Sequence, residues 1–356
     1  MDHDDLLGLA NGVPWLLLPS LDAFYCLEDG ELHYTELVDN ITDNNWSIRG
    51  SSHGWLAMVE DGPLIVLFNP FTTQRIQLPP FTTLPGVSDY RFSVSDTRLE
   101  YQMPVSYNGC LCRSCLECDP ARSWIRHDRK MLYVQRIILT GDPVSKEGCA
   151  AVAVLRGRLA FCRVAYGEAK SCWTAIHQPE GVFVADVVLW NDRLYILDND
   201  GLGVCNLEDP NPNMEIVLVP IREMNCKKRL VVSPENELFF ISQQCDPYVG
   251  FITGFKVHRL INFEEGWAET NDIRDYVIFW GVNPSICLSA TEFPTSQLIS
   301  NKIYFSDSSL VEHDDQLVHD IGIFNLETRR IEPLPVAPMP SGCLSPVWLT
   351  PFLTWD

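Results

Sequence analysis

The chain has 356 residues, and its 47 acidic side chains against 26 basic ones give a formal net charge of −21 at pH 7. This charge argues against a nucleic-acid binder, which needs clustered lysine and arginine to neutralise phosphates, and it disfavours an anionic membrane surface for the same reason. With 46% hydrophobic and 21% charged residues, the chain is too apolar to be disordered and can bury a large core.

The N-terminal segment gives the first information on location. Residues 1–5 are acidic and lack the basic start of a signal peptide. The apolar run at 13–18 is stopped by Pro19 and is too short to span a bilayer. We therefore expect a cytoplasmic or nuclear protein. In such a compartment, most of the 13 cysteines are expected to be reduced thiols.

Short apolar runs bounded by turn residues follow this segment, and they are typical of β-strands. In chain order they are 16–18, 23–26, 30–34, 55–59, 64–68, 150–155, 158–162, 172–176, 186–190, 193–197, 202–207, 229–233, 237–241, 253–257, 301–305, 322–326, 330–334 and 346–350. The clearest group spans 186–207, where Asn191-Asp192 accepts the positive φ of a tight hairpin turn. A blade of a β-propeller takes about 40–50 residues, and these groups recur at irregular intervals in that range.

The repeated groups predict an all-β fold, a single kelch-like β-propeller of about six to seven blades of antiparallel strands. Two stacked β-sandwich domains are the alternative. Because propellers often complete one blade with both ends of the chain, the run at 346–350 is expected to pair with those at 16–18 and 23–26. The predicted organisation is a short tail at 1–12 and a propeller at 13–356, with an inserted loop around 81–131.

Several motifs, taken in order, resemble one known family. They occupy 48–57, 67–72, 76–80, 133–143, 286–294, 301–307, 322–327 and 346–351. On these residues the chain resembles the plant F-box-associated β-propeller proteins of the kinase-interacting F-box, kelch-like group. The resemblance covers roughly residues 13–351. It implies a kelch-like propeller that binds a protein target, and, where an F-box precedes the propeller, delivery of that target to an SCF-type ubiquitin ligase through Skp1.

The segment before the predicted propeller is much shorter than an F-box, a small helical domain of about 40–50 residues. Residues 4–9 weakly resemble one turn of such a domain. We therefore expect a propeller without an F-box: a free propeller, an F-box-less relative or a truncated gene product. Direct docking to Skp1 is not expected.

A cysteine cluster stands out within the predicted inserted loop. Cys110, Cys112, Cys115 and Cys118 contain two overlapping C-x-x-C steps, a spacing at which thiolates can converge on one Zn²⁺. A second, distant pair of ligands is absent, although His127 could serve as a further ligand. The alternative is a reduced, redox-sensitive loop. No other cofactor is expected.

The segment Gly50-Ser-Ser-His-Gly54 formally matches G-x-S-x-G, with Ser52 at the nucleophile position. A nucleophile elbow requires a strand, a tight turn and then a helix. Because a predicted strand follows at 55–59, we interpret the segment as an ordinary turn. The protein is therefore expected not to be an enzyme. A hydrolase with its site at the propeller channel is the rival hypothesis, and a degenerate relative without retained function is the third.

The acidic turns suggest what the propeller binds. We expect its loops to form an acidic face for a partner protein that has a basic surface, with electrostatic attraction assisting encounter. The acidic turn at 312–316 supplies the candidate contact residues Glu312, Asp314 and Asp315.

Overall fold

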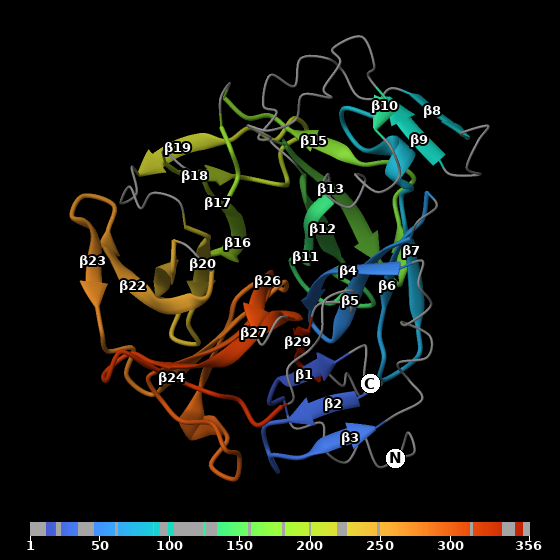
Figure 1. Cartoon of the computed structure of the whole chain (residues 1–356). Helices are drawn as coiled ribbons and strands as arrows, with labels where there is room; N and C mark the ends of the chain where they lie inside the picture. The colour runs from blue at the N-terminus through green and yellow to red at the C-terminus, as the bar shows by residue number, and fades with distance from the viewer. Residues whose placement is uncertain are drawn as a thin grey trace.

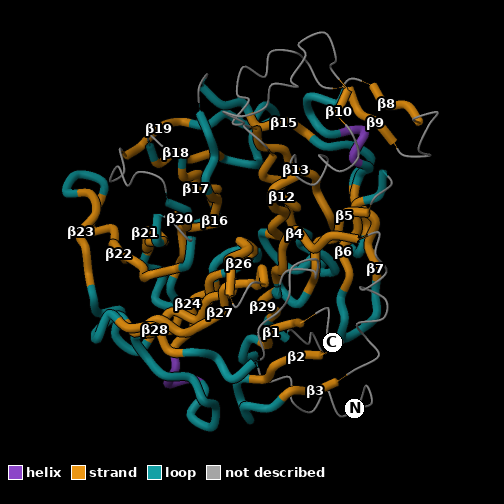
Figure 2. Tube along the Cα trace, in the orientation of Figure 1, coloured by secondary structure: helices purple, strands orange, loops and turns teal. Residues whose placement is uncertain are grey.

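Six β-sheets stand around a common centre in the computed structural model (Figure 1). The structure describes residues 12–18, 23–34, 46–60, 63–87, 89–92, 99–102, 124–125, 134–155, 158–179, 182–198, 201–218, 226–247, 250–313, 316–336 and 346–351. Its described regular elements are strands and two short 3₁₀ turns, Phe81–Thr83 and Ala290–Glu292 (Figure 2). The predicted all-β propeller is confirmed, and it has six blades. No helix in this part of the chain is long and apolar enough to cross a membrane.

The blades are numbered here in chain order, and their strands are given in the order in which they pair. Blade 1 holds β29 (Val347–Leu349), β1 (Trp15–Leu18), β2 (Ala23–Cys26) and β3 (Leu32–Tyr34); blade 2 holds β4 (Trp46–Ser52), β5 (Trp55–Glu60), β6 (Ile65–Phe68) and β7 (Arg75–Leu78). Blade 3 holds β11 (Val134–Leu139), β12 (Cys149–Leu155), β13 (Arg158–Ala165) and β14 (Glu168–Ala169), with β15 (Thr174–Ile176) also paired to β13.

Blades 4 and 5 each consist of four antiparallel strands, whereas blade 6 has five strands. Blade 4 holds β16 (Asp186–Trp190), β17 (Arg193–Leu197), β18 (Leu202–Cys205) and β19 (Glu215–Leu218). Blade 5 holds β20 (Lys228–Val232), β21 (Leu238–Cys245), β22 (Ile252–Asn262) and β23 (Gly266–Thr270). Blade 6 holds β25 (Ile286–Ser289), β24 (Tyr276–Trp280), β26 (Lys302–His313), β27 (Gln316–Asn325) and β28 (Arg330–Glu332).

Blade 6 departs from the expectation of purely antiparallel strands, because β24 and β26 pair in parallel. A parallel pair needs a long crossover connection. Residues 281–301 supply it, and they include β25, which folds back on β24. Blade 6 therefore contains β25 as an additional strand at one edge of its sheet.

A separate three-stranded sheet lies within the segment expected to be an inserted loop. It consists of β8 (Asp89–Phe92), β9 (Leu99–Gln102) and β10 (Trp124–Ile125), and it stands outside the ring (Figure 1). Phe81 and Leu84, which precede it, are buried against blades 2 and 3. The start of this segment therefore belongs to the propeller core.

Six apolar clusters hold the ring together, one at each seam between neighbouring blades. For example, Leu197 of blade 4 packs with Leu230 and Phe240 of blade 5. Each fully buried aliphatic or aromatic side chain contributes about 1.5–3 kcal/mol relative to its exposed form. Because strands present alternate residues to their two faces, each blade buries side chains against both of its neighbours.

The two ends of the described chain meet in blade 1, as expected. Trp15, Leu16 and Leu17 of β1 pair with Leu349, Trp348 and Val347 of β29. The indole N–H of Trp348 also donates to the carbonyl oxygen of Trp280 in blade 6, at 3.2 Å. β29 therefore closes the ring by pairing with β1 inside blade 1 and by bonding to blade 6.

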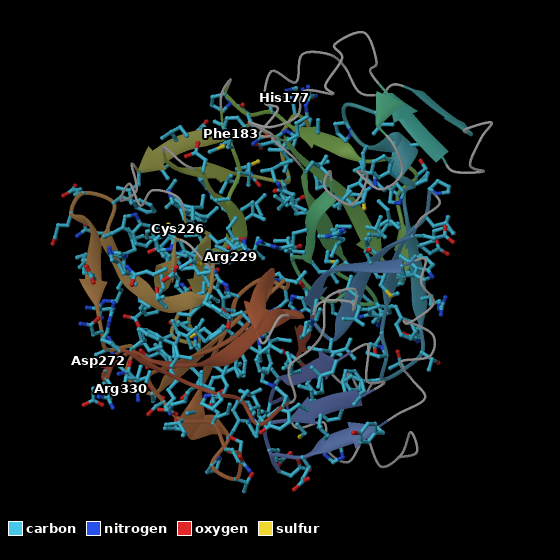
Figure 3. All side chains as sticks on the ribbon, in the orientation of Figure 1. His177, Phe183, Cys226, Arg229, Asp272 and Arg330 are labelled. Carbon is cyan, nitrogen blue, oxygen red and sulfur yellow. The ribbon has the colours of Figure 1, made fainter. Side chains whose placement is uncertain are left out.

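A buried ion pair and a buried hydrogen bond join the first strands of blades 3, 4 and 5. Arg136 on β11 forms an ion pair with Asp186 on β16, and both side chains are buried. The other carboxylate oxygen of Asp186 accepts a hydrogen bond from the backbone N–H of Leu230 on β20, at 2.8 Å. Arg229 lies on the side of blade 5 that faces the middle of the ring (Figure 3) and stacks over Trp280, 5.4 Å from the ring centroid. One carboxylate thus connects three blades.

Gly50 marks a close approach between blades 2 and 3. A β-bulge in β4 lies between Ile48 and Gly50, and a Cβ added at Gly50 would stand 2.1 Å from the carbonyl oxygen of Ile137. Because the obstructing atom belongs to the backbone, the seam would have to open. We expect Gly50→Ala to destabilise the protein by about 1–3 kcal/mol, measured as a lowered denaturant midpoint.

Gly141 is the matched control for this prediction. A Cβ there would meet its nearest neighbour, the Cβ of Cys149, at 3.5 Å, which is ordinary contact. Gly141→Ala should leave the midpoint nearly unchanged. Equal effects of the two substitutions would contradict the close approach at Gly50.

Candidate functional site

The turns at one end of blades 4, 5 and 6 form a continuous polar surface. Because strands alternate in direction, the turn after the first strand of a blade and the turn after its third strand lie at the same end of the ring. We call this surface the acidic turn face and define it by residues 190–193, 233–237, 263–265 and 271–275. Both residues of the turn at Asn191-Asp192 have positive φ, 50° and 58°, which confirms the tight hairpin predicted for this pair.

Three aromatic side chains lie together at the seam between blades 4 and 5, where this surface meets the core. The rings of Trp190 and Tyr195 are 5.0 Å apart, and that of Phe263 lies 6.2 Å from Trp190 and 6.4 Å from Tyr195. Phe263 is 43% exposed although it belongs to a large hydrophobic residue type. We call these three residues the aromatic trio. Tyr195 is buried, so Phe263 and the partly buried Trp190 supply the apolar area next to solvent, where a partner could cover it.

Hydrogen bonds fix the turns of blades 4 and 5 relative to each other. The indole N–H of Trp190 donates to the carbonyl oxygen of Asn236 at 3.0 Å, and the side-chain amide of Asn236 donates to Asn191 Oδ1 at 2.7 Å. The orientation of Trp190 is therefore set before any partner arrives. Preorganisation of this kind lowers the entropic cost of binding.

Arg274 connects the turns of blades 5 and 6. Its guanidinium lies 2.9 Å from a carboxylate oxygen of Glu235 and 3.3 Å from one of Glu237. The negative charge of Glu237 raises the pKa of Arg274. Glu237 also lies 3.3 Å from Arg259. These contacts are exposed, so they organise the surface more than they stabilise the fold.

The acidic turn face carries a surplus of negative charge. Its segments contain seven carboxylates and two arginines: Asp192, Glu235, Glu237, Glu264, Glu265, Asp272 and Asp275 against Arg193 and Arg274. The formal charge of these segments is therefore 2 − 7 = −5. An apolar aromatic centre beside an acidic surface is suited to a protein segment that carries lysine or arginine.

None of the site residues predicted from the sequence is among the residues that define the acidic turn face. Glu312 belongs to β26, whose hairpin with β27 extends toward the middle of the ring in Figure 1, whereas Asp314 and Asp315 lie outside the described residues. The predicted metal ligands Cys110, Cys112, Cys115 and Cys118 also lie outside them. These predictions stay predictions.

The G-x-S-x-G segment folds as the ordinary turn that was expected. Ser52 ends β4, and β5 follows directly, so the strand–turn–helix context of a nucleophile elbow is absent from this segment. The Ser52 hydroxyl oxygen accepts a hydrogen bond from the N–H of Leu139 at 3.3 Å. Burial lowers the pKa of His53, so its neutral form is favoured.

The aromatic trio could not be identified from the sequence. Four tryptophans belong to the apolar clusters at seams between blades: Trp55, Trp173, Trp280 and Trp348. Trp190 also packs against the cluster between blades 4 and 5, but it is only partly buried. Phe263 stands in a turn beside two glutamates, and only the fold brings it to Trp190.

A family model and one curated relative match this chain over most of its length. The model of the KIB1-4 β-propeller matches residues 24–325. The F-box protein SKIP23 of Arabidopsis thaliana is 22% identical over 320 residues, which are 80% of this chain and 70% of that protein.

The solved structures that match this chain have low sequence identity and low structural similarity to it. One is YCF48 bound to a D1 peptide, with a TM-score of 0.33, 10% identity, and coverage of 93% of this chain and 82% of that one. Another is the dihydro-heme d1 dehydrogenase NirN, with a TM-score of 0.36, 8% identity, and coverage of 94% and 74%. Similarity at this level carries no functional argument.

Proposed function

Because the chain belongs to the KIB1-4 β-propeller family, we propose that it is a non-enzymatic protein-interaction module that recognises a partner through its acidic turn face. The observation that carries this proposal is the aromatic trio, which spans two blades and leaves Phe263 43% exposed beside a surface of formal charge −5. Aromatic side chains of this kind are enriched among the residues that dominate binding energy.

The charge defines the partner that fits best. A segment with lysine or arginine side chains would be attracted by the seven carboxylates, and a cationic group could also stack on an aromatic ring. Its apolar side chains would cover Phe263 and the adjacent Trp190. We propose that the partner presents such a basic segment at its own surface.

The relationship to F-box proteins suggests the cellular role. The curated relative is an F-box protein, and the propeller of this chain would then serve as a target-recognition domain in the ubiquitin pathway. Cys26, Cys149, Cys162, Cys172, Cys205 and Cys287 are reduced cysteines, which fits the cytoplasm or nucleus.

Affinity purification from the source tissue tests the proposal, with bound proteins quantified by mass spectrometry. We expect Phe263→Ala to reduce capture of the specific partner by roughly 10-fold or more, because truncation of a central aromatic anchor costs about 2 kcal/mol or more. Tyr166→Ala is the matched control: Tyr166 is 70% exposed in the turn between β13 and β14 of blade 3, outside the segments that define the acidic turn face.

The salt dependence of binding tests the electrostatic attraction between the partner and the acidic turn face. With the captured partner purified, affinity is expected to fall steeply as salt is raised, since screening weakens attraction between exposed charges. Affinity that is independent of salt would contradict a basic partner segment. Equal capture by wild type, Phe263→Ala and Tyr166→Ala would contradict the aromatic trio as the contact.

A further inference from the structure

Blade 1 contains a cluster of metal-ligand side chains at the turn between β2 and β3. Cys26, Asp29 and His33 each offer a donor atom, and these atoms all lie within 4.8 Å of one another. Among the residues that the structure describes, no other three histidine, cysteine or acidic side chains meet in this way. His33 pairs with Phe24 in the strand register, so Cys26 and His33 lie on the same face of the hairpin.

A backbone hydrogen bond and core packing hold the turn that carries the three donors. Gly30 has φ of 75°, and its N–H donates to the carbonyl oxygen of Cys26 at 3.0 Å. Cys26 has no exposed surface and belongs to the apolar cluster between blades 1 and 2, so packing fixes the position of its sulfur.

The loop from blade 6 holds the turn in place. The N–H of Gln297 donates to the carbonyl oxygen of Leu27 at 2.9 Å. The side chain of Gln297 lies against Gly30, where an added Cβ would stand 2.4 Å from Gln297 Nε2. The spacing of the three donors is therefore fixed by contacts outside the hairpin as well as inside it.

The other two donors, His33 and Asp29, are hydrogen-bonded to each other. His33 Nε2 lies 2.8 Å from Asp29 Oδ2, while Asp29 Oδ1 accepts a hydrogen bond from the N–H of Glu31 at 2.9 Å. Two ligands bound to one tetrahedral zinc ion stand about 3.3 Å apart, so a cation could enter after a small outward shift. The side chains of His33 and Asp29 are 13% and 34% exposed, which gives the cation a path from solvent.

We propose that Cys26, Asp29 and His33 bind one divalent cation of the zinc class. One sulfur, one nitrogen and one oxygen ligand match the preferences of Zn²⁺, and three protein ligands leave a fourth position for water. Glu28 and Glu31 flank the site in sequence and add negative charge that attracts a cation. The bound ion would stabilise the β2–β3 hairpin of blade 1, the blade that contains both ends of the described chain.

Titration of the reduced, metal-free full chain with Co²⁺ tests this site, because Co²⁺ replaces Zn²⁺ and makes the coordination visible. We expect one equivalent to produce the charge-transfer band of a single thiolate and to be displaced by Zn²⁺. Cys26→Ser should abolish the band, and His33→Asn should weaken binding at least 10-fold. Cys172→Ser, which changes an exposed thiol in blade 3, should leave the titration unchanged.

A second measurement separates this site from the cysteine cluster at 110–118. A Cys115→Ser variant should keep the single-thiolate band if the cation is bound in blade 1. Loss of the band in Cys115→Ser with retention in Cys26→Ser would overturn the proposal, as would no band in the wild type. Circular dichroism checks that each variant is folded, and Zn²⁺ should raise the unfolding temperature of wild type but not of folded His33→Asn.

Discussion

Removal of residues 346–356 is expected to unfold the propeller. The deletion takes away β29, whose residues Val347, Trp348 and Leu349 have no exposed surface. It leaves β1 paired only with β2 and removes Trp348 from the apolar cluster between blades 1 and 6. Truncation of one such tryptophan to alanine costs about 3–5 kcal/mol, whereas native domains are stable by only about 5–15 kcal/mol.

Circular dichroism and thermal unfolding measure this effect. The truncated chain should lack a cooperative transition. A chain that ends after Pro351 is the matched control, because it retains β29 and should unfold like the wild type. The substitution Trp348→Ala should lower stability by about 3–5 kcal/mol, since it removes the hydrogen bond to Trp280 and the ring contact with Phe279, 5.0 Å away. A cooperative, wild-type transition without β29 would contradict closure by the last strand.

Replacement of Asp186 by alanine should cause the second large loss of stability. Asp186 is 1% exposed and neutralises Arg136, which is 6% exposed. It also accepts the hydrogen bond of the Leu230 N–H. The substitution leaves a buried cation without its counter-charge and a backbone donor without its acceptor. We expect destabilisation by about 3–5 kcal/mol, measured by denaturant unfolding.

The double substitution Arg136→Met with Asp186→Leu distinguishes an unpaired charge from a simple loss of packing. Replacing both members of a buried pair by apolar residues of similar size is often neutral or stabilising. We therefore expect the double variant to be more stable than Asp186→Ala. If it is equally unstable, the charge of Arg136 is not the cause of the loss. A wild-type midpoint in Asp186→Ala would contradict the connection of three blades through this carboxylate.

Local patterns were sufficient to predict the ordinary blades. The short apolar runs on both sides of Asn191-Asp192 predicted β16 and β17, because both the strands and their turn depend on neighbouring residues. Pairing of 346–350 with the N-terminal strands was also predicted, from the general way in which propellers close. The blade number was predicted only as six to seven, because seams between blades depend on packing between distant segments.

The features that were missed depend on contacts between segments far apart in the chain. The parallel pair of β24 and β26 arises because the connection between them folds back as β25, and an apolar strand pattern does not reveal its direction. The contact of Trp190 with Phe263 depends on how two blades pack together. The metal-ligand cluster is closer in sequence, but only the register of β2 and β3 shows that Cys26 and His33 share a face.

Hydrogen exchange of the full chain, with and without its purified partner, tests most directly whether the acidic turn face is the binding surface. The account predicts that binding slows exchange in peptides covering 187–196, 233–240 and 260–275. The same peptides in Phe263→Ala should show reduced protection at equal concentrations. Protection confined to the β26–β27 hairpin or to the turns of blades 1 to 3 would contradict the account.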